Sequence, residues 1–467
     1  MTIITPTSID DLVRIEEQRF IDRMPRSAKM AERAVGSMAG GLTSSWANTR
    51  PIPVWVERGE GGHLWDVDGN AYVDYHGGYG VNVVGHANPH VVAAVQHRVA
   101  QGTHFAQPTE DAMIVAEELV RRFGLPLWRF NNSGTEATMD AIHLMRAVTG
   151  RDLIIKVEGT YHGHHDSVVV SIFRNLDDLG PADEPWRIPG GGVPQSVAEL
   201  VRIVPYNDLA ALERVFEQHP GQIAGMIIEP MMMNAGIITP IAGYLEGIRE
   251  ITQRHGALLA FDEVKTGLVV HPGGATKLFG VQPDIVCLAK ALGGGVPCGA
   301  VGGTLEVMSA IVDGRYDQVG TFNGNPLTMA AARAVLTEVL TDDAYTRAND
   351  LGVYILDTAL AILAEHGQPA YGYSNGFKVS VVFDGHRAAN YREFLAINTA
   401  VSHLHFLTQF NRGVFLPPWG KSESLTLAVS HTKADADLYL ANLATVVEQL
   451  MPLQSRASEM FAVGSLT

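Results

Sequence analysis

Cysteine is nearly absent from this 467-residue sequence: only Cys287 and Cys298 occur, and they do not form a CxxC pair. The sequence therefore predicts neither a disulfide framework nor a cysteine metal site, and it favours a reducing compartment. Basic residues are also in deficit, with 34 Lys and Arg against 50 Asp and Glu and a net charge of -16. Because a nucleic-acid backbone requires a basic surface, we expect no nucleic-acid partner.

Long hydrophobic runs are missing as well. No apolar stretch approaches the roughly 18 residues that a membrane-spanning helix needs, so we expect no membrane association. The N-terminal segment carries acidic residues early and lacks a basic region followed by an apolar one, so it is not predicted to be a secretory signal. The expected location is the cytoplasm. With 46% hydrophobic residues, the chain is long enough to form more than one domain with a large core.

The order of sequence patterns predicts an α/β protein. Residues 9–36 have a helical pattern, and residues 53–75 alternate apolar and polar positions around glycine turns, as in an antiparallel meander. From Pro108 onward, helices of ten to fifteen residues alternate with strands, which indicates a parallel sheet. We predict that residues 108–335 form the large α/β domain. The N-terminal segment 1–107 and the α+β segment 336–467 are expected to form a smaller domain together.

Two charged residues stand at the ends of predicted buried strands. Lys290 closes the run PDIVCLAK before a glycine-rich turn, and Asp262 closes ALLAFD. A lysine amine and a carboxylate in these places suit an aldehyde cofactor bound as a Schiff base, pyridoxal 5'-phosphate (PLP), whose pyridine nitrogen needs an acidic partner. The alternative is that Lys290 caps a strand and Asp262 a turn.

Two polar turns offer sites for a phosphate group. Ser133, Gly134 and Thr135 stand where a strand turns into a helix, so hydroxyls, backbone N–H groups and the positive helix end surround one small volume. An ordinary helix N-cap is the alternative, and it uses the same donors. A second turn before a helix, GTFNGNP, places Thr321 where its hydroxyl and N–H can contact another face of a phosphate.

The segment Tyr161–Asp166 contains three histidines and an acid, but its spacing does not suit zinc, and we predict no metal site. Tyr161 is instead predicted to stack on a planar cofactor, next to His162, while His164 and His165 are expected to pack in the loop. At the end of another strand, Glu229 and Asn234 are predicted to face the phenolic oxygen of a pyridoxal ring.

Taken together, these motifs resemble the class III, fold-type I PLP-dependent aminotransferases, within the branch of glutamate-1-semialdehyde aminomutase and β-amino-acid transaminases. The resemblance covers nearly the whole chain. It is carried in order by GGHLWDVDGNAYVDY, VGHANP, QPTEDAM, NNSGTEATMDAIHLMRAVTGRDLIIKVEGTYHGHHD, EPMMMNAG, FDEVKTG, AKALGGGVPCGAVGG and GTFNGNPLTMAA.

The resemblance implies a mostly parallel seven-stranded sheet flanked by helices, plus the smaller α+β domain. It implies that Lys290 is the internal aldimine lysine, that Asp262 pairs with the pyridine nitrogen, and that Val264 packs on the ring face opposite Tyr161. It further implies phosphate contacts from Ser133, Gly134 and Thr135. Thr321 would reach the phosphate of a partner subunit, so the active site would be shared within a homodimer.

One departure concerns the substrate. Where the aminomutase pattern carries an arginine that grips a carboxylate, this sequence has Ala47. Trp46, Tyr79 and Leu268 are candidates for a more apolar pocket, with core packing as the alternative. Arg50, Arg412 and Lys421 are candidates for replacing the carboxylate grip, and Glu423 for an acid in the substrate pocket. Lys265 is a second amine near the ring, with a solvated or ion-paired lysine as the alternative.

Three hypotheses about function follow. The first is an aminotransferase that moves an amino group from an amine or amino acid, including β-amino acids, to a keto acid. The second is an isomerase of the same fold, either an aminomutase or an amino acid racemase. The third is a catalytically silent relative that serves as a binding protein, against which the intact Lys290 and Asp262 argue.

Overall fold

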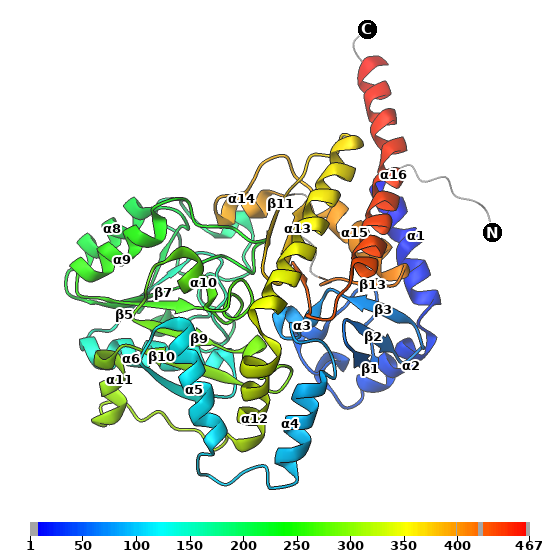
Figure 1. Cartoon of the computed structure of the whole chain (residues 1–467). Coiled ribbons are helices and arrows are strands. Elements are labelled where there is room, and N and C mark those ends of the chain that lie inside the picture. Colours follow the sequence, from blue (N-terminus) through cyan, green and yellow to red (C-terminus); the bar gives the residue numbers. More distant parts are fainter. Residues whose placement is uncertain (1–7, 398, 419–423, 464–467) are drawn as a thin grey trace.

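A computed structural model describes residues 8–397, 399–418 and 424–463 of the chain. Its larger part is built on a seven-stranded sheet (Figure 1). Strand β10 runs antiparallel to both of its neighbours, and the pairs from β9 to β6 are parallel. In sheet order the strands are β4 (Leu127–Asn131), β10 (Gly299–Gly303), β9 (Ile285–Leu288), β8 (Leu258–Asp262), β7 (Ile223–Ile228), β5 (Leu153–Val157) and β6 (Val201–Val204). The predicted fold class is thus confirmed.

Helices cover this sheet on both faces (Figure 1). Strands β5, β7, β9 and β10 are buried at every position, as expected for a sheet sandwiched between two helical layers. The helices of this part are α5 (Glu110–Phe123), α6 (Gly134–Thr149), α7 (Gln195–Ala198), α8 (Leu209–Gln218), α9 (Tyr244–Arg254), α10 (Gly274–Phe279), α11 (Leu305–Val312) and α12 (Pro326–Ala334).

The smaller part joins the two ends of the chain. Strand β13 (Val414–Phe415) pairs in parallel with β3 (Ala71–Asp74), so a C-terminal strand completes the N-terminal sheet of β1 (Val56–Glu60) and β2 (His63–Asp66). A second sheet consists of β11 (Tyr371–Asn375), β12 (Lys378–Val382) and β14 (Leu425–Thr426). The other helices are α1 (Ile9–Asp22), α2 (Pro25–Ala34), α3 (Gly77–Gly80), α4 (Pro89–Val99), α13 (Asp342–Glu365), α14 (Tyr391–Ala396), α15 (Ala400–Asn411) and α16 (Lys433–Val463).

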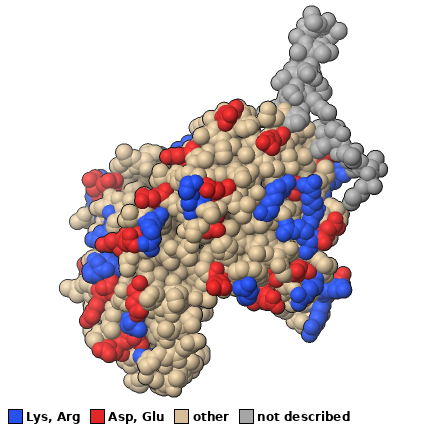
Figure 2. Space-filling view, turned by 45° about the vertical axis from the view of Figure 1, so that its right-hand side comes forward, with Lys and Arg blue, Asp and Glu red and all other residues tan. Residues whose placement is uncertain are grey.

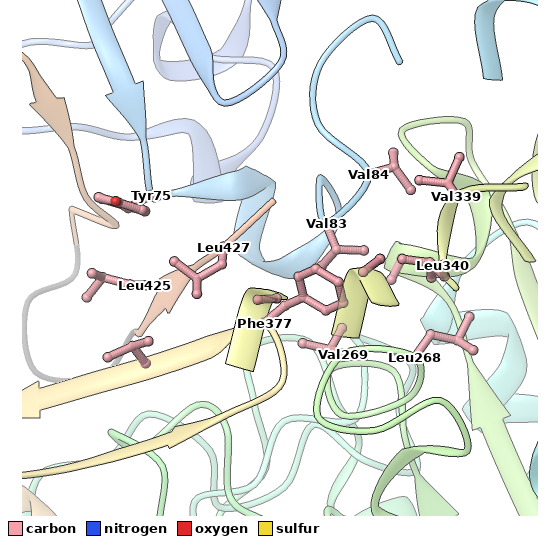
Figure 3. Packing of buried hydrophobic residues seen from close by; sticks show 14 of the residues in the cluster. Tyr75, Val83, Val84, Leu268, Val269, Val339, Leu340, Phe377, Leu425 and Leu427 are labelled. Atoms are coloured by element: carbon pink, nitrogen blue, oxygen red, sulfur yellow. The ribbon is translucent and has the colours of Figure 1, made fainter. Parts of the chain in front are cut away.

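A shared hydrophobic cluster joins these parts of the chain. Figure 3 shows Val83 from the N-terminal segment, Val269 from the loop after β8, and Phe377 and Leu427 from the C-terminal segment packed against one another. Leu268 belongs to the same cluster and is fully buried, so its proposed place in an apolar substrate pocket is wrong. It packs in the core that fixes the smaller part against the sheet.

Two predicted elements differ from the structure. The helical stretch 9–36 is interrupted at Arg23 and Met24, because Pro25 has no N–H to continue the hydrogen bonding of α1 and instead begins α2. Strand β6 was not predicted, although the apolar residues of Val201–Val204 are buried at the sheet edge.

On the face shown in Figure 2, basic and acidic side chains lie among one another, with wide uncharged areas between them. None of the helices within the described ranges combines the length and apolar character that crossing a bilayer requires.

Candidate active site

A cavity of about 410 Å³ lies where the carboxyl ends of the central strands meet loops from the N-terminal segment. In open α/β sheets this edge is where ligands bind. The structure brings most of the predicted site residues together on its walls. These residues are Trp46, Tyr79, Ser133, Gly134, Thr135, Tyr161, His162, Glu229, Asn234, Asp262, Val264 and Lys290.

Lys290 follows β9 in an unusual backbone conformation. Its φ angle is 49°, in the left-handed region that costs a residue with a side chain roughly 1–2 kcal/mol. Gly294 and Gly295 after it also have φ angles in the left-handed region, so the chain turns sharply soon after the lysine. The turn directs the lysine to the cavity wall, where Asp262 also lies. Strain at such a position is typical of functional sites.

Asp262 is held from two sides at the end of β8. Its Oδ1 accepts the backbone N–H of Val264 at 3.0 Å, and its Oδ2 lies 2.7 Å from Nδ1 of His162. The His162 side chain is fully buried, and its Nε2 has no hydrogen-bond partner among the described residues. The carboxylate is therefore fixed in orientation and retains lone pairs for a ligand N–H.

Glu229 serves mainly to shape the site. Its carboxylate accepts the backbone N–H groups of Tyr161 and Met233, and the Asn234 amide donates to both of its oxygens. Burial raises the pKa of Glu229, while His162 acts in the opposite direction. The expected approach of Glu229 and Asn234 to a ring oxygen is thus refined: Glu229 holds the two segments, and only the amide oxygen of Asn234 is left for a ligand.

The predicted phosphate turn is the N-terminus of helix α6. Ser133 is the N-cap, and its hydroxyl accepts the N–H of Glu136 at 3.2 Å, while Glu136 Oε2 accepts the N–H of Asn132 at 2.6 Å. This arrangement resembles a capping box, except that Glu136 accepts the N–H of the residue before the N-cap, so the N-cap alternative is also present. The remaining first-turn N–H groups and the positive helix end face the cavity wall, which suits a phosphate.

Close packing leaves a narrow slot between these walls. Gly163 has a φ of 99°, and a Cβ there would lie 2.8 Å from the Cα of Thr135. A Cβ on Gly134 would lie 2.8 Å from Cγ1 of Val264. Both positions require glycine, and they place the phosphate turn against the segments that carry Tyr161 and Val264. A flat ring with a phosphate arm fits this shape.

The other histidines of the Tyr161–Asp166 segment have separate partners. His164 Nδ1 lies 3.3 Å from the Thr135 hydroxyl. His165 lies beside the Thr138 hydroxyl, and burial lowers the pKa of His165 to about 4. Within the described part of the chain, no group of three His, Cys, Asp or Glu side chains is arranged to hold a metal ion.

Lys156 is a buried residue that the sequence analysis missed. Its side chain lies in β5, fully buried, and Nζ donates to the carbonyls of Thr160 at 3.0 Å and Val170 at 2.9 Å. Burial lowers the pKa of Lys156 to about 7, against the attraction of Glu229. It ties together the loop that leads to Tyr161 and the segment that leads to Phe173. The signal in the sequence is a lone lysine inside the apolar run LIIKV.

Two predicted residues lie elsewhere, and two others fall outside the described residues. Arg412 pairs with the buried Glu16 of helix α1 at 3.4 Å and does not line the cavity, so its placement in the substrate pocket is wrong. Thr321 lines a separate hollow formed mainly by residues 104–108 and 318–326. The two hollows are neighbours, because Asn132 of the cavity wall donates to Asn323 at 3.0 Å. Glu423 and Lys421 lie outside the described residues.

The remaining candidates are Arg50 and Lys265. Arg50 is exposed and precedes a cis peptide bond to Pro51, away from the cavity lining. Lys265 is buried and lines the cavity, and its charge acts on Glu229. Its position agrees with a second amine near the ring, and its charge opposes the rise in the pKa of Glu229.

Comparisons with known proteins agree with this geometry. A model of the class-III aminotransferase family matches residues 45–440. The glutamate-1-semialdehyde 2,1-aminomutase 2 of Exiguobacterium sibiricum is 38% identical over 430 residues, covering 91% of this chain and 97% of that protein. A solved omega-transaminase from Sphaerobacter thermophilus has a TM-score of 0.87 at 33% identity, covering 92% of this chain and 99% of its own. The β-phenylalanine aminotransferase of Variovorax paradoxus has a TM-score of 0.86 at 29% identity, covering 96% of this chain and 99% of its own.

This chain therefore belongs to the class-III aminotransferases. Members of this family are PLP-dependent enzymes, and solved relatives contain PLP or its amino form. The donors on the cavity walls fit that cofactor: a lysine for the aldehyde, a carboxylate for the ring nitrogen, and a helix N-terminus for the phosphate.

Proposed function

We propose that this protein is a transaminase that moves an amino group from an amine or amino acid donor to a keto acid acceptor. The observation that carries the proposal is the meeting of Lys290 and Asp262 in one cavity that also contains the N-terminus of α6. PLP supplies an aldehyde that captures amines and a ring that accepts electrons from the substrate carbon.

The residues that line the cavity have proposed roles in holding the cofactor and moving a proton. The amine of Lys290 holds the cofactor covalently and, once a substrate amine has displaced it, carries a proton to and from the substrate carbon. The carboxylate of Asp262 keeps the ring nitrogen protonated. Tyr161 and Val264 cover the two faces of the ring. Ser133, Gly134 and Thr135 bind the phosphate.

A β-amino acid is among the proposed donors. The structural similarity to the Variovorax paradoxus enzyme, whose described substrate is β-phenylalanine, supports this part of the proposal. The acceptor is proposed to be a keto acid, whose carbonyl carbon would receive the amino group while Lys290 would deliver the proton to that carbon.

An aminomutase is the second candidate, and the 38% identity to the Exiguobacterium sibiricum aminomutase favours it. Ala47 argues against it, because the aminomutase pattern has a carboxylate-binding arginine there. A racemase would share the same early steps. Product analysis without an added keto acid separates these isomerases from a transaminase, since an isomerase needs no acceptor.

The active site is proposed to be completed by a second copy of the chain. Thr321 lies in its own hollow rather than in the cavity, and the apolar side chains of Phe105, Val319 and Phe322 beside it are exposed. A homodimer would cover these side chains and bring Thr321 of the partner subunit to the phosphate.

The two cysteines are free and buried, which supports a reducing location such as the cytoplasm.

A donor screen tests the proposal. Purified protein with bound PLP is mixed with a panel of simple amines, α-amino acids and β-amino acids, and the visible absorbance of the cofactor is followed. At least one donor is expected to convert the cofactor to its amino form, and a keto acid to restore it. Lys290→Ala is the control, for which no turnover is expected. A panel in which no donor changes the wild-type spectrum contradicts transamination.

A further inference from the structure

Most polar side chains on the cavity wall have a task that does not involve the substrate. Lys290, Asp262, Ser133 and Thr135 are assigned to the cofactor. Others are occupied by protein: Asn132 donates to Asn323, Thr266 to Glu263, and Asn234 to Glu229. Apart from Lys265 and the amide oxygen of Asn234, the wall that is left for a substrate, among the described residues, is therefore largely apolar. It consists of Trp46, Tyr79, Val81, Met233, Val296, Pro297 and Cys298.

Trp46 lies on this wall and is the centre of an aromatic cluster. Its ring lies 5.4 Å from Tyr79, 5.6 Å from Tyr161 and 5.8 Å from Phe173 between centroids, with interplanar angles of 65°, 73° and 73°. Phe173 in turn stacks on Tyr161 at 5.7 Å. Edge-to-face and stacked contacts at these separations are the favourable ones for aromatic rings. The cluster thus joins the ring expected to cover the cofactor to the surface of the protein.

The cluster is held in a fixed arrangement. The Tyr79 hydroxyl donates to the carbonyl of Trp46 at 2.7 Å, so the two rings cannot separate without losing a hydrogen bond. Burial raises the pKa of the Tyr161 hydroxyl, and a hydrogen bond with the Trp46 side chain acts against that increase. Tyr79 and Phe173 have left-handed φ angles of 60° and 48°, conformations that side chains other than glycine adopt at a cost in free energy.

The outer member of the cluster is unusually open to solvent. Phe173 does not line the cavity itself, but its ring contacts Trp46 and Tyr161, which do, and it is 56% exposed, so a strained backbone presents an apolar ring to water beside the cavity wall. Core packing does not account for a ring in this position. A ligand that covers Phe173 and touches Trp46 would recover the hydrophobic free energy that the exposure forfeits.

We infer that Trp46, Tyr79 and Phe173 form the binding surface for an aryl group on the amine donor. The inference rests on the proposed transaminase function and specifies its substrate class. A planar ring can contact the edges and faces of these three residues at once, whereas a methyl group covers only a small part of one. The donor side chain is therefore selected for being aromatic.

Matched donors that differ only in phenyl against methyl test this inference. The pairs are 3-amino-3-phenylpropanoate with 3-aminobutanoate, and 1-phenylethylamine with 2-aminopropane. The rate of cofactor conversion gives kcat/KM for each donor without an acceptor. In the wild-type protein the aryl donor of at least one pair is expected to be favoured by about tenfold or more, the discrimination that an apolar pocket typically provides.

Trp46→Leu and Phe173→Leu keep apolar bulk and remove the ring. Each is expected to lower the aryl-to-methyl ratio by about fivefold to tenfold. The ratio is the readout because any loss of cofactor affects both donors equally. Trp65→Leu is the control: this tryptophan stacks under Arg58 at 3.5 Å, outside the cavity lining, and its removal is expected to leave the ratio unchanged.

The outcomes separate the inference from the proposed function. A wild-type ratio near one, or a ratio that neither Leu variant changes, overturns the aryl site. If other donors of the panel convert the cofactor while both aryl donors fail, the aryl site is also overturned and transamination stands. If no donor converts the cofactor, the proposed function fails and the inference fails with it.

Discussion

Oδ2 of Asp262 lies 2.7 Å from Nδ1 of His162, and both side chains are buried. Asp262 is the last residue of β8 and His162 lies in the loop after β5, so their contact couples the carboxylate proposed to meet the cofactor to the segment carrying Tyr161. The histidine fixes the orientation of Asp262, since the second oxygen is already held by the Val264 N–H. Two predictions concern this pair.

Asp262→Asn is expected to lower kcat/KM by about 10²–10³, because the amide cannot stabilise a protonated ring nitrogen and a preorganised charge is lost. The measurement is the rate of cofactor conversion by a productive donor. Cofactor content, read from absorbance, is expected to remain near that of the wild type because the other contacts persist. A variant that keeps more than a third of the wild-type rate would contradict the role of Asp262.

His162→Leu is expected to reduce kcat/KM by about tenfold, since it leaves a buried carboxylate oxygen without its partner. His162→Gln is the matched control, because its amide N–H can donate to Asp262. It should retain activity within about threefold of the wild type, consistent with one conserved hydrogen bond. Equal losses in the two variants would show that ring packing, and not the hydrogen bond, is what His162 provides.

Lys156→Met replaces the buried amine by an apolar side chain of similar length. Its effect on the free energy of unfolding is expected to depend on pH. The pKa of Lys156 in the folded protein is about 7, below its usual value, so between these two values the unfolded chain binds more protons. From pH 7 to 9, the free energy of unfolding of the wild type should therefore rise by about 1.4 kcal/mol per pH unit relative to that of Lys156→Met.

The measurement for Lys156 is urea unfolding of both proteins at pH 7, 8 and 9. Lys433→Met is the control, because Lys433 is exposed, pairs with Asp437, and remains protonated over this range. The difference in the free energy of unfolding between Lys433→Met and the wild type should stay constant with pH. A constant difference for Lys156→Met as well would mean that the buried lysine keeps its proton throughout.

Thr321→Val is expected to raise the Kd for PLP by about tenfold, if its hydroxyl binds the phosphate across the dimer, since one hydrogen bond to a charged group contributes roughly that much. Titration of the protein freed of cofactor measures this constant. Thr337→Val, on the exposed side of the segment after α12, is the matched control and should leave Kd unchanged. An unaltered Kd for Thr321→Val would remove Thr321 from the site.

The strand ends were the most predictable part of the site. Lys290 and Asp262 follow runs of apolar residues, and such runs form buried parallel strands whose ends share one edge of the sheet. The glycine-rich turn after Lys290 and the cap at Ser133 are likewise local signals. These features depend on neighbouring residues in the chain, so their positions could be read before any tertiary contact was known.

Contacts between distant segments could not be predicted in this way. Arg412 is a cation directly after helix α15, and nothing near it in sequence indicates that Glu16, almost four hundred residues earlier, pairs with it. Leu268 follows a site motif, yet it is buried in the core, where the hydroxyl of Tyr345 from α13 donates to its carbonyl. Lys156 finds its two carbonyl acceptors only because the loop after β5 folds back over it.

The order of motifs by itself determined that this chain is an α/β enzyme with a lysine and an aspartate at neighbouring strand ends, because periodicity and turn residues act over a few positions. The tertiary structure decided which side chains surround them: the His162 contact, the enclosure of Lys156 and the aromatic cluster around Trp46. Those depend on the packing of segments that are remote in sequence, where side-chain shape and burial, and not local propensity, select the partners.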